Sequence, residues 1–74
     1  MTKLLLEVVI ERDRDGYFAY CPSLQGCYTQ GETYEDAIER IKDAIRLHLA
    51  DRRATHQPLP STESISVTTL ELAV

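Results

Sequence analysis

The sequence predicts a small α+β domain in which a mostly antiparallel sheet carries one helix on one face. Three observations support this prediction: short strand patterns separated by turn residues near the N-terminus, one long stretch with helical periodicity, and one further strand pattern at the C-terminus. The predicted order is β-β-β-α-β. A chain of 74 residues accommodates one domain, which we expect to span residues 1–74.

The first predicted strand covers residues 3–11, which alternate imperfectly between two faces. One face is purely apolar and is predicted to be buried; it consists of Leu4, Leu6, Val8 and Ile10. The opposite face mixes Leu5 and Val9 with charged residues, so we expect it to be only partly covered.

Two turns are predicted after this strand. The pair Asp15-Gly16 favours a tight hairpin, because glycine adopts positive φ freely. A second strand follows over residues 17–21 and ends at Pro22, which has no N–H to donate. A short third strand is predicted over residues 27–30.

The helix gives the clearest pattern. Thr33 is a favourable N-cap, and Asp36 stands three residues later as in a variant of the capping box. The helix is predicted to run to about residue 50. An apolar stripe recurs every three or four residues through it, formed by Tyr34, Ala37, Ile38, Ile41, Ala44, Ile45, His48 and Leu49.

The C-terminal part divides into a linker and a strand. Residues 54–64 contain Pro58 and Pro60 and are predicted to be a linker. Residues 65–72 are predicted to form a fourth strand. Its apolar residues change phase near Thr68, so we expect a bulge there or a strand that is covered on both faces.

The net charge of −4 is unevenly distributed. Residues 1–39 contain eight acidic and three basic residues, a net charge of −5, and the remainder carries +1. An acidic surface repels phosphate backbones, which argues against direct nucleic-acid binding. It suits a basic protein partner, although the same charge also describes a solvated surface that keeps a small protein in solution.

The cysteines and histidines do not form a recognisable metal or catalytic motif. Cys21 and Cys27 are farther apart than the cysteine pairs of structural zinc sites, and only His48 and His56 could complete such a site. We expect two packed thiols and no metal, cofactor or catalytic residue. No apolar run is long enough to span a membrane, and Glu7 comes too early for a signal peptide, so we expect a cytoplasmic protein with reduced cysteines.

A pattern of glycine, aromatic and proline residues crosses both turns and continues into the helix. It consists of Asp15-Gly16-Tyr17-Phe18, Tyr20, Pro22, Leu24, Gly26-Cys27, Thr29, Gly31, Thr33, Glu35-Asp36-Ala37-Ile38 and Ala44-Ile45. Over nearly the whole chain, this pattern resembles the N-terminal domain of the HicB-type antitoxins and their stand-alone relatives. Two positions depart from it: Gln25 replaces a proline, and Ser23 replaces an aspartate.

The resemblance implies a partial RNase H-like fold, in agreement with the predicted order of elements. It also implies binding to a small basic toxin of the HicA type, which cleaves mRNA. Complete antitoxins add a DNA-binding domain; the present sequence stops at Val74, so we expect neither that domain nor direct DNA binding. The sequence lacks a full set of metal-binding acids, so nuclease activity, a third interpretation, is not carried over.

Two functional hypotheses follow. In the first, the protein neutralises the toxin by covering its active surface, with contacts predicted at Glu7, Glu11, Glu35, Glu39 and Leu47. In the second, it is a stand-alone oligomeric module that binds a small ligand or another protein. In either case Leu5 and Val9 are predicted to take part in self-association into a dimer or tetramer, because a small sheet leaves edges to protect.

Overall fold

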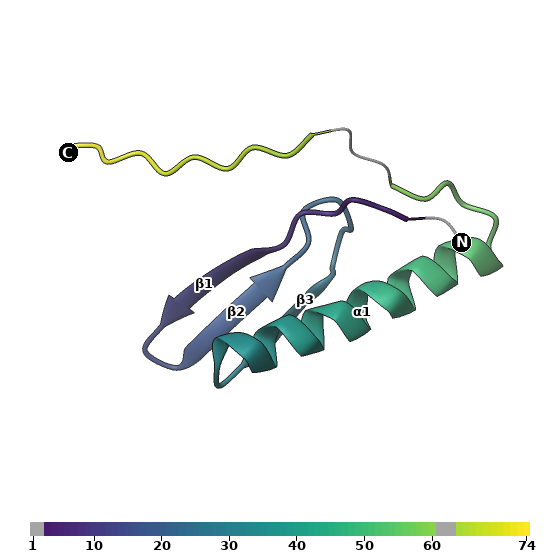
Figure 1. Ribbon diagram of the computed structural model, residues 1–74, viewed down its shortest axis with the longest axis horizontal. Coiled ribbons are helices and arrows are strands. Elements are labelled where there is room, and N and C mark those ends of the chain that lie inside the picture. The colour runs from purple at the N-terminus through teal and green to yellow at the C-terminus, as the bar shows by residue number, and fades with distance from the viewer. Residues whose placement is uncertain (1–2, 61–63) are drawn as a thin grey trace.

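A three-stranded antiparallel sheet forms one layer of the protein in a computed structural model, which describes residues 3–60 and 64–74. Its strands are β1 (Val9–Asp13), β2 (Gly16–Tyr20) and β3 (Tyr28–Gly31), in the spatial order β1-β2-β3. The single helix covers one face of this sheet (Figure 1). The α+β class predicted from the sequence is therefore confirmed.

Both predicted turns are present. Gly16 has φ of 132° and pairs with Asp13 at the end of the β1–β2 hairpin, where the Asp15 N–H donates to Asp13 Oδ1 at 2.8 Å. Beyond β2, the Cys21 N–H donates to the Cys27 carbonyl at 3.0 Å and closes the second turn. Gly26, with φ of 78°, permits the change of direction.

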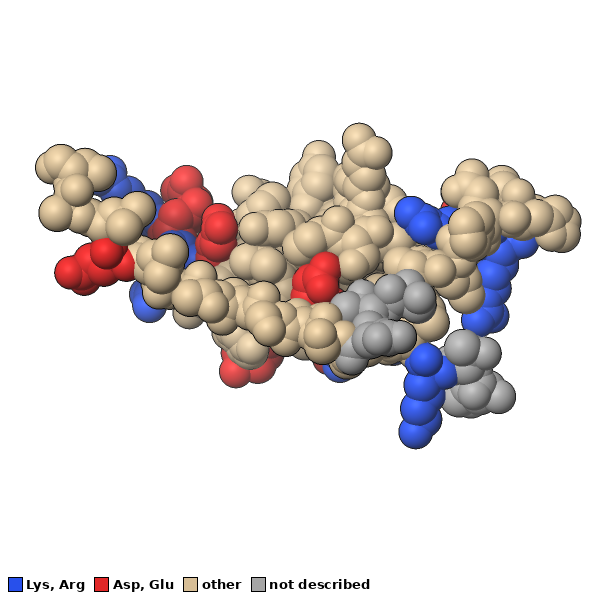
Figure 2. Space-filling view, turned by 90° about the horizontal axis from the view of Figure 1, so that it is seen from above, with Lys and Arg blue, Asp and Glu red and all other residues tan. Residues whose placement is uncertain are grey.

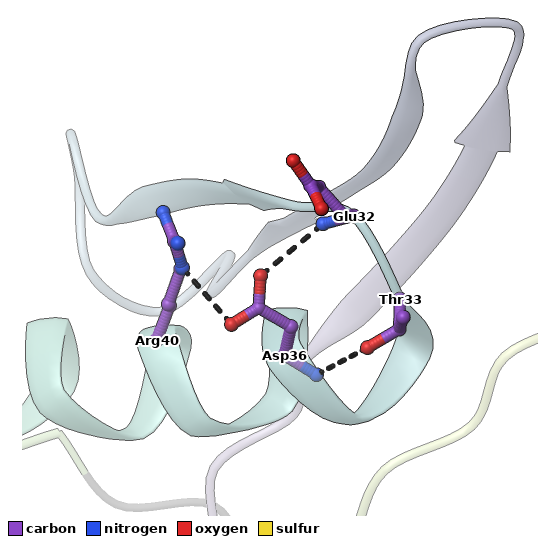
Figure 3. Close-up of polar contacts among 4 residues, drawn as sticks. All are labelled: Glu32, Thr33, Asp36 and Arg40. Atoms are coloured by element: carbon purple, nitrogen blue, oxygen red, sulfur yellow. Dashed lines mark hydrogen bonds and ion pairs between the residues drawn. The ribbon is translucent and has the colours of Figure 1, made fainter.

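The helix α1 (Tyr34–Ala54) begins at the predicted cap. Thr33 Oγ1 accepts a hydrogen bond from the Asp36 N–H at 3.0 Å, and Asp36 Oδ2 accepts one from the Glu32 N–H at 3.2 Å (Figure 3). This is a capping-box arrangement that reaches back one residue before the cap. The helix ends later than predicted, because Arg52 and Arg53 are good helix formers that also favour the negative end of its dipole.

The core lies between α1 and the two strands nearest to it, β2 and β3. Gly31 marks the closest approach, since a Cβ atom there would lie 2.6 Å from the Ala37 nitrogen. The apolar face of the first predicted strand is only half-buried, because β1 lies at the margin of the area that α1 covers. The buried core consists of Ala19, Cys21, Leu24, Cys27, Ala37 and Ile41.

The ends of the chain differ from the prediction. The first strand begins at Val9 instead of residue 3. The predicted fourth strand over 65–72 is wrong for the single chain, because residues 64–74 form no strand and pair with no sheet edge. The sequence pattern specifies a segment suited to a strand, but a strand needs a partner. Residues 61–63 of the predicted linker lie outside the described residues.

Candidate protein-binding surfaces

The sheet face that points away from α1 carries an aromatic cluster. Alternation along β2 places Phe18 and Tyr20 on this face, while Tyr17 and the buried Ala19 point toward the helix. Tyr28 on β3 pairs with Tyr20, so its side chain lies on the same face as Phe18 and Tyr20. The Phe18 ring centroid is 5.8 Å from those of both tyrosines. Tyr28 is 62% exposed and the other two rings are half-buried, so the cluster presents aromatic surface to a partner.

A hollow of about 390 Å³ continues from this cluster toward the second turn. Its floor includes Leu24 and the two cysteines, and its rim includes Pro22 and Gly26. Almost all of its surface is apolar. The hollow is suited to an apolar side chain of a partner, because it offers no charged group to orient a polar ligand.

Two of the predicted residues border the aromatic cluster. Val9 lies opposite Tyr20 and Glu11 lies opposite Phe18 in the β1–β2 pairing, so both share its face. Glu7 is held near the second turn, where its Oε1 accepts a hydrogen bond from Ser23 Oγ at 2.8 Å. We call Val9, Glu11, Phe18, Tyr20 and Tyr28 the open sheet face.

The other predicted contacts lie in the helical layer. Glu35 and Glu39 are exposed on α1, and Leu47 is 72% exposed, as expected from its position outside the apolar stripe. Glu39 Oε1 is 3.4 Å from Lys42 Nζ, one of three exposed ion pairs along the described helix. We call the surface from Glu35 to Leu47 the outer helix face. The predicted contacts are therefore divided between opposite layers of the domain.

A smaller hollow of about 210 Å³ lies where the β1–β2 turn approaches the start of α1. Asp13, Asp15 and Glu32 line it together with Arg40, whose Nε is 3.1 Å from Asp36 Oδ1. In Figure 2 most of the visible acidic side chains lie in the left half, which holds this turn, whereas the right end shows mainly basic side chains. On the face that Figure 2 shows, acidic side chains therefore gather around this turn, with basic side chains among them.

The two thiols are free, buried and placed opposite each other at the end of β2 and β3. Burial raises the pKa of both Cys21 and Cys27, and the nearby Glu7 carboxylate adds to the increase for Cys21. Both are therefore protonated, weak nucleophiles near neutral pH. Within residues 3–60 and 64–74, no group of three or more histidine, cysteine, aspartate or glutamate side chains is placed to hold a metal ion.

Comparison with known proteins identifies the family. A model described as HicB-like antitoxin of bacterial toxin–antitoxin system matches residues 6–72. The chain belongs to the HicB-like antitoxin family. This match confirms the resemblance found in the sequence. It indicates a role in a toxin–antitoxin system, and the family is generally non-enzymatic.

Several relatives of the chain are of similar length. A UPF0150 protein of Helicobacter pylori is 41% identical over 70 residues, which cover 95% of this chain and 97% of the relative. A UPF0150 protein of Synechocystis is 46% identical over 59 residues, covering 78% and 75%. One from Thermoplasma acidophilum is 36% identical over 62 residues, covering 82% and 90%. No solved structure matches the chain.

Sequence reasoning missed two features of this HicB-like domain. The aromatic cluster was hidden because β2 carries aromatic residues on both faces, so the sequence alone does not show which face the helix covers. The smaller hollow, which we call the acidic hollow because Asp13, Asp15 and Glu32 line it, depends on the β2–β3 pairing of Tyr17 with Gly31. This pairing brings Glu32 beside the first turn. No helix in the described parts of the chain is both long and apolar enough to cross a membrane.

Proposed function

We propose that this protein is a non-enzymatic antitoxin that binds a small basic toxin of the HicA type in the cytoplasm and covers its RNA-cleaving surface. The observation that carries the proposal is the match to the HicB-like antitoxin family over residues 6–72. The net charge of −5 in residues 1–39 supports it, because a protein that binds RNA presents a basic surface. The same charge disfavours direct contact with DNA.

The outer helix face is the proposed contact. Glu35 and Leu47 are separated by about 18 Å along the helix axis, at ~1.5 Å per residue, a span that one small protein can cover. Glu35 and Glu39 would supply attraction to basic residues, and Leu47 an apolar contact. The acidic hollow extends this surface at the start of the helix.

Charge reversal on the two layers tests this assignment. Glu35→Lys should weaken binding to the purified toxin by about tenfold, or about 1.4 kcal/mol, because it adds repulsion at the proposed interface. Glu11→Lys makes the same change of charge on the open sheet face and is the matched control, with an expected change below about threefold. A larger effect of Glu11→Lys would place the toxin on the sheet instead.

Co-expression tests the function itself. Production of this protein should restore growth in cells whose growth is inhibited by the basic protein encoded next to it. The two proteins should also purify as a complex. Absence of both the complex and the rescue of growth would contradict an antitoxin function.

The second candidate function is a stand-alone module that binds another protein or a small apolar ligand without a toxin partner. The apolar hollow beside Tyr28 favours it. A binding partner captured through the open sheet face, in a cell that encodes no neighbouring basic protein, would support this alternative. Loss of that capture in Tyr28→Ala, with Tyr34→Ala unaffected, would locate the site, because Tyr34 is similarly exposed on the helical layer.

A further inference from the structure

Two extended segments, residues 3–8 and residues 64–74, have no backbone partner among the described residues. Residues 3–8 continue β1 toward the N-terminus. In the described parts of the chain, neither segment makes a backbone–backbone hydrogen bond. The outer edge of β1 is also open, because β1 is an edge strand of the described sheet. Unpaired strand edges readily accept another strand, since their N–H and C=O groups are available.

The C-terminal segment exposes side chains that normally become buried. Val67 is 74% exposed and Leu72 is 76% exposed, and Leu70 is similar. The total accessible surface is 6349 Å², whereas a compact chain of 8.4 kDa exposes roughly 4,600 Å². The excess of roughly 1,700 Å² per chain is about twice the ~800 Å² that each partner contributes to a protein–protein interface of standard size. The radius of gyration of 14.1 Å likewise exceeds the ~11 Å of a compact chain.

We propose that residues 64–74 of one copy add as a fourth strand to the free edge of β1 in a second copy, and that the exchange is reciprocal. Reciprocal exchange of identical elements gives a closed two-fold dimer. It pairs both extended segments of each chain and leaves no free β1 edge.

The path of the chain favours a second copy as the acceptor. Figure 1 shows the C-terminal segment running past the β1–β2 turn, so that its last residues extend beyond the sheet of their own chain. The linker is held against the end of α1, where the Gln57 N–H donates to the Arg52 carbonyl at 2.8 Å and Arg52 Nη1 donates to the Pro58 carbonyl at 3.1 Å. Pro58 and Pro60 stiffen the chain beyond it.

The two segments also match in their distribution of apolar residues. Residues 3–8 with Val9 carry leucine or valine on both faces, including Leu5, which is more than half exposed. The C-terminal segment is apolar on one face before Thr68 and on the other face after it. A strand beside β1 meets the helix layer on one side and the aromatic cluster on the other, so the change of phase suits this position.

The toxin-free protein tests this proposal without reference to its antitoxin function. Sedimentation should give twice the 8.4 kDa chain mass. A ¹³C-labelled and an unlabelled sample, mixed in denaturant and refolded, should show nuclear Overhauser effects between Val67 methyl groups of one copy and Leu5 of the other. A monomer, effects confined to one chain, or a dimer without contacts of the C-terminal segment would each overturn the proposal.

A pair of tail variants provides the matched control. Val67→Asp should weaken dimerisation by at least tenfold, because it places a charge at an apolar position of the exchanged strand. Thr69→Asp adds the same charge two residues later, at a position that is already polar, and should change dimerisation by less than threefold. Equal effects of the two variants, or none, would contradict burial of Val67 against a second copy.

Discussion

The segment from Gly16 to Ile41 and the two chain ends contain similar strand-like and apolar patterns but reach different outcomes. In the central segment every element finds its partner nearby, because the turn between β2 and β3 and the cap at Thr33 place successive elements side by side. Residues 3–8 and 64–74 have no such partner among the described residues of the same chain. Sequence pattern thus determines which residues can form a strand, while proximity along the chain determines whether they do.

The largest expected effect comes from removing a core side chain of the central segment. Ile41 is 1% exposed beneath the sheet, and Ile41→Ala should lower the free energy of unfolding by about 2–5 kcal/mol. This is comparable to the whole stability of so small a core, which is ~3–5 kcal/mol. Leu47→Ala, on the exposed side of the same helix, should change it by less than about 0.5 kcal/mol. Urea unfolding measures both, and equal losses would contradict the core as described.

Loss of the helix cap should have a smaller effect. Thr33→Ala removes the acceptor for the Asp36 N–H and should lower the free energy of unfolding by about 1 kcal/mol. Thr55→Ala is the control at the opposite end, where the hydroxyl donates to the Asp51 and Arg52 carbonyls. The Thr55 and Gln57 N–H groups already satisfy these two carbonyls. Thermal unfolding should separate the two variants. A cap variant as stable as the control would show that the central segment does not depend on Thr33.

The smallest expected effect concerns the buried thiols. Burial raises their pKa values in the folded state, so the unfolded chain loses thiol protons at lower pH than the folded one. Stability should be independent of these groups at neutral pH and should decrease as pH rises above the ordinary thiol pKa and through the raised one. Unfolding measured between pH 7 and 10 tests this. The loss of stability with rising pH should be smaller in Cys27→Ala. An unchanged pH dependence in that variant would contradict the assigned cause.

The sequence predicted most of the central segment and less of the surfaces. Asp15-Gly16 and Thr33 act locally, so their hairpin and cap could be predicted without knowledge of the fold. The position of the C-terminal segment depends on a partner edge, which no local pattern specifies. The predicted contacts at Glu11 and Glu35 were recognised by charge alone, and charge does not show that they lie on opposite layers.

Inhibition of the toxin's RNA cleavage by the purified protein is the most direct test of an antitoxin function. Titration of a fixed amount of the neighbouring basic toxin should abolish cleavage of a model mRNA at a fixed stoichiometric ratio, without any metal or cofactor supplied to the antitoxin. Glu35→Lys should shift the titration to higher protein concentration. Cleavage that persists in the presence of excess folded protein would contradict the account.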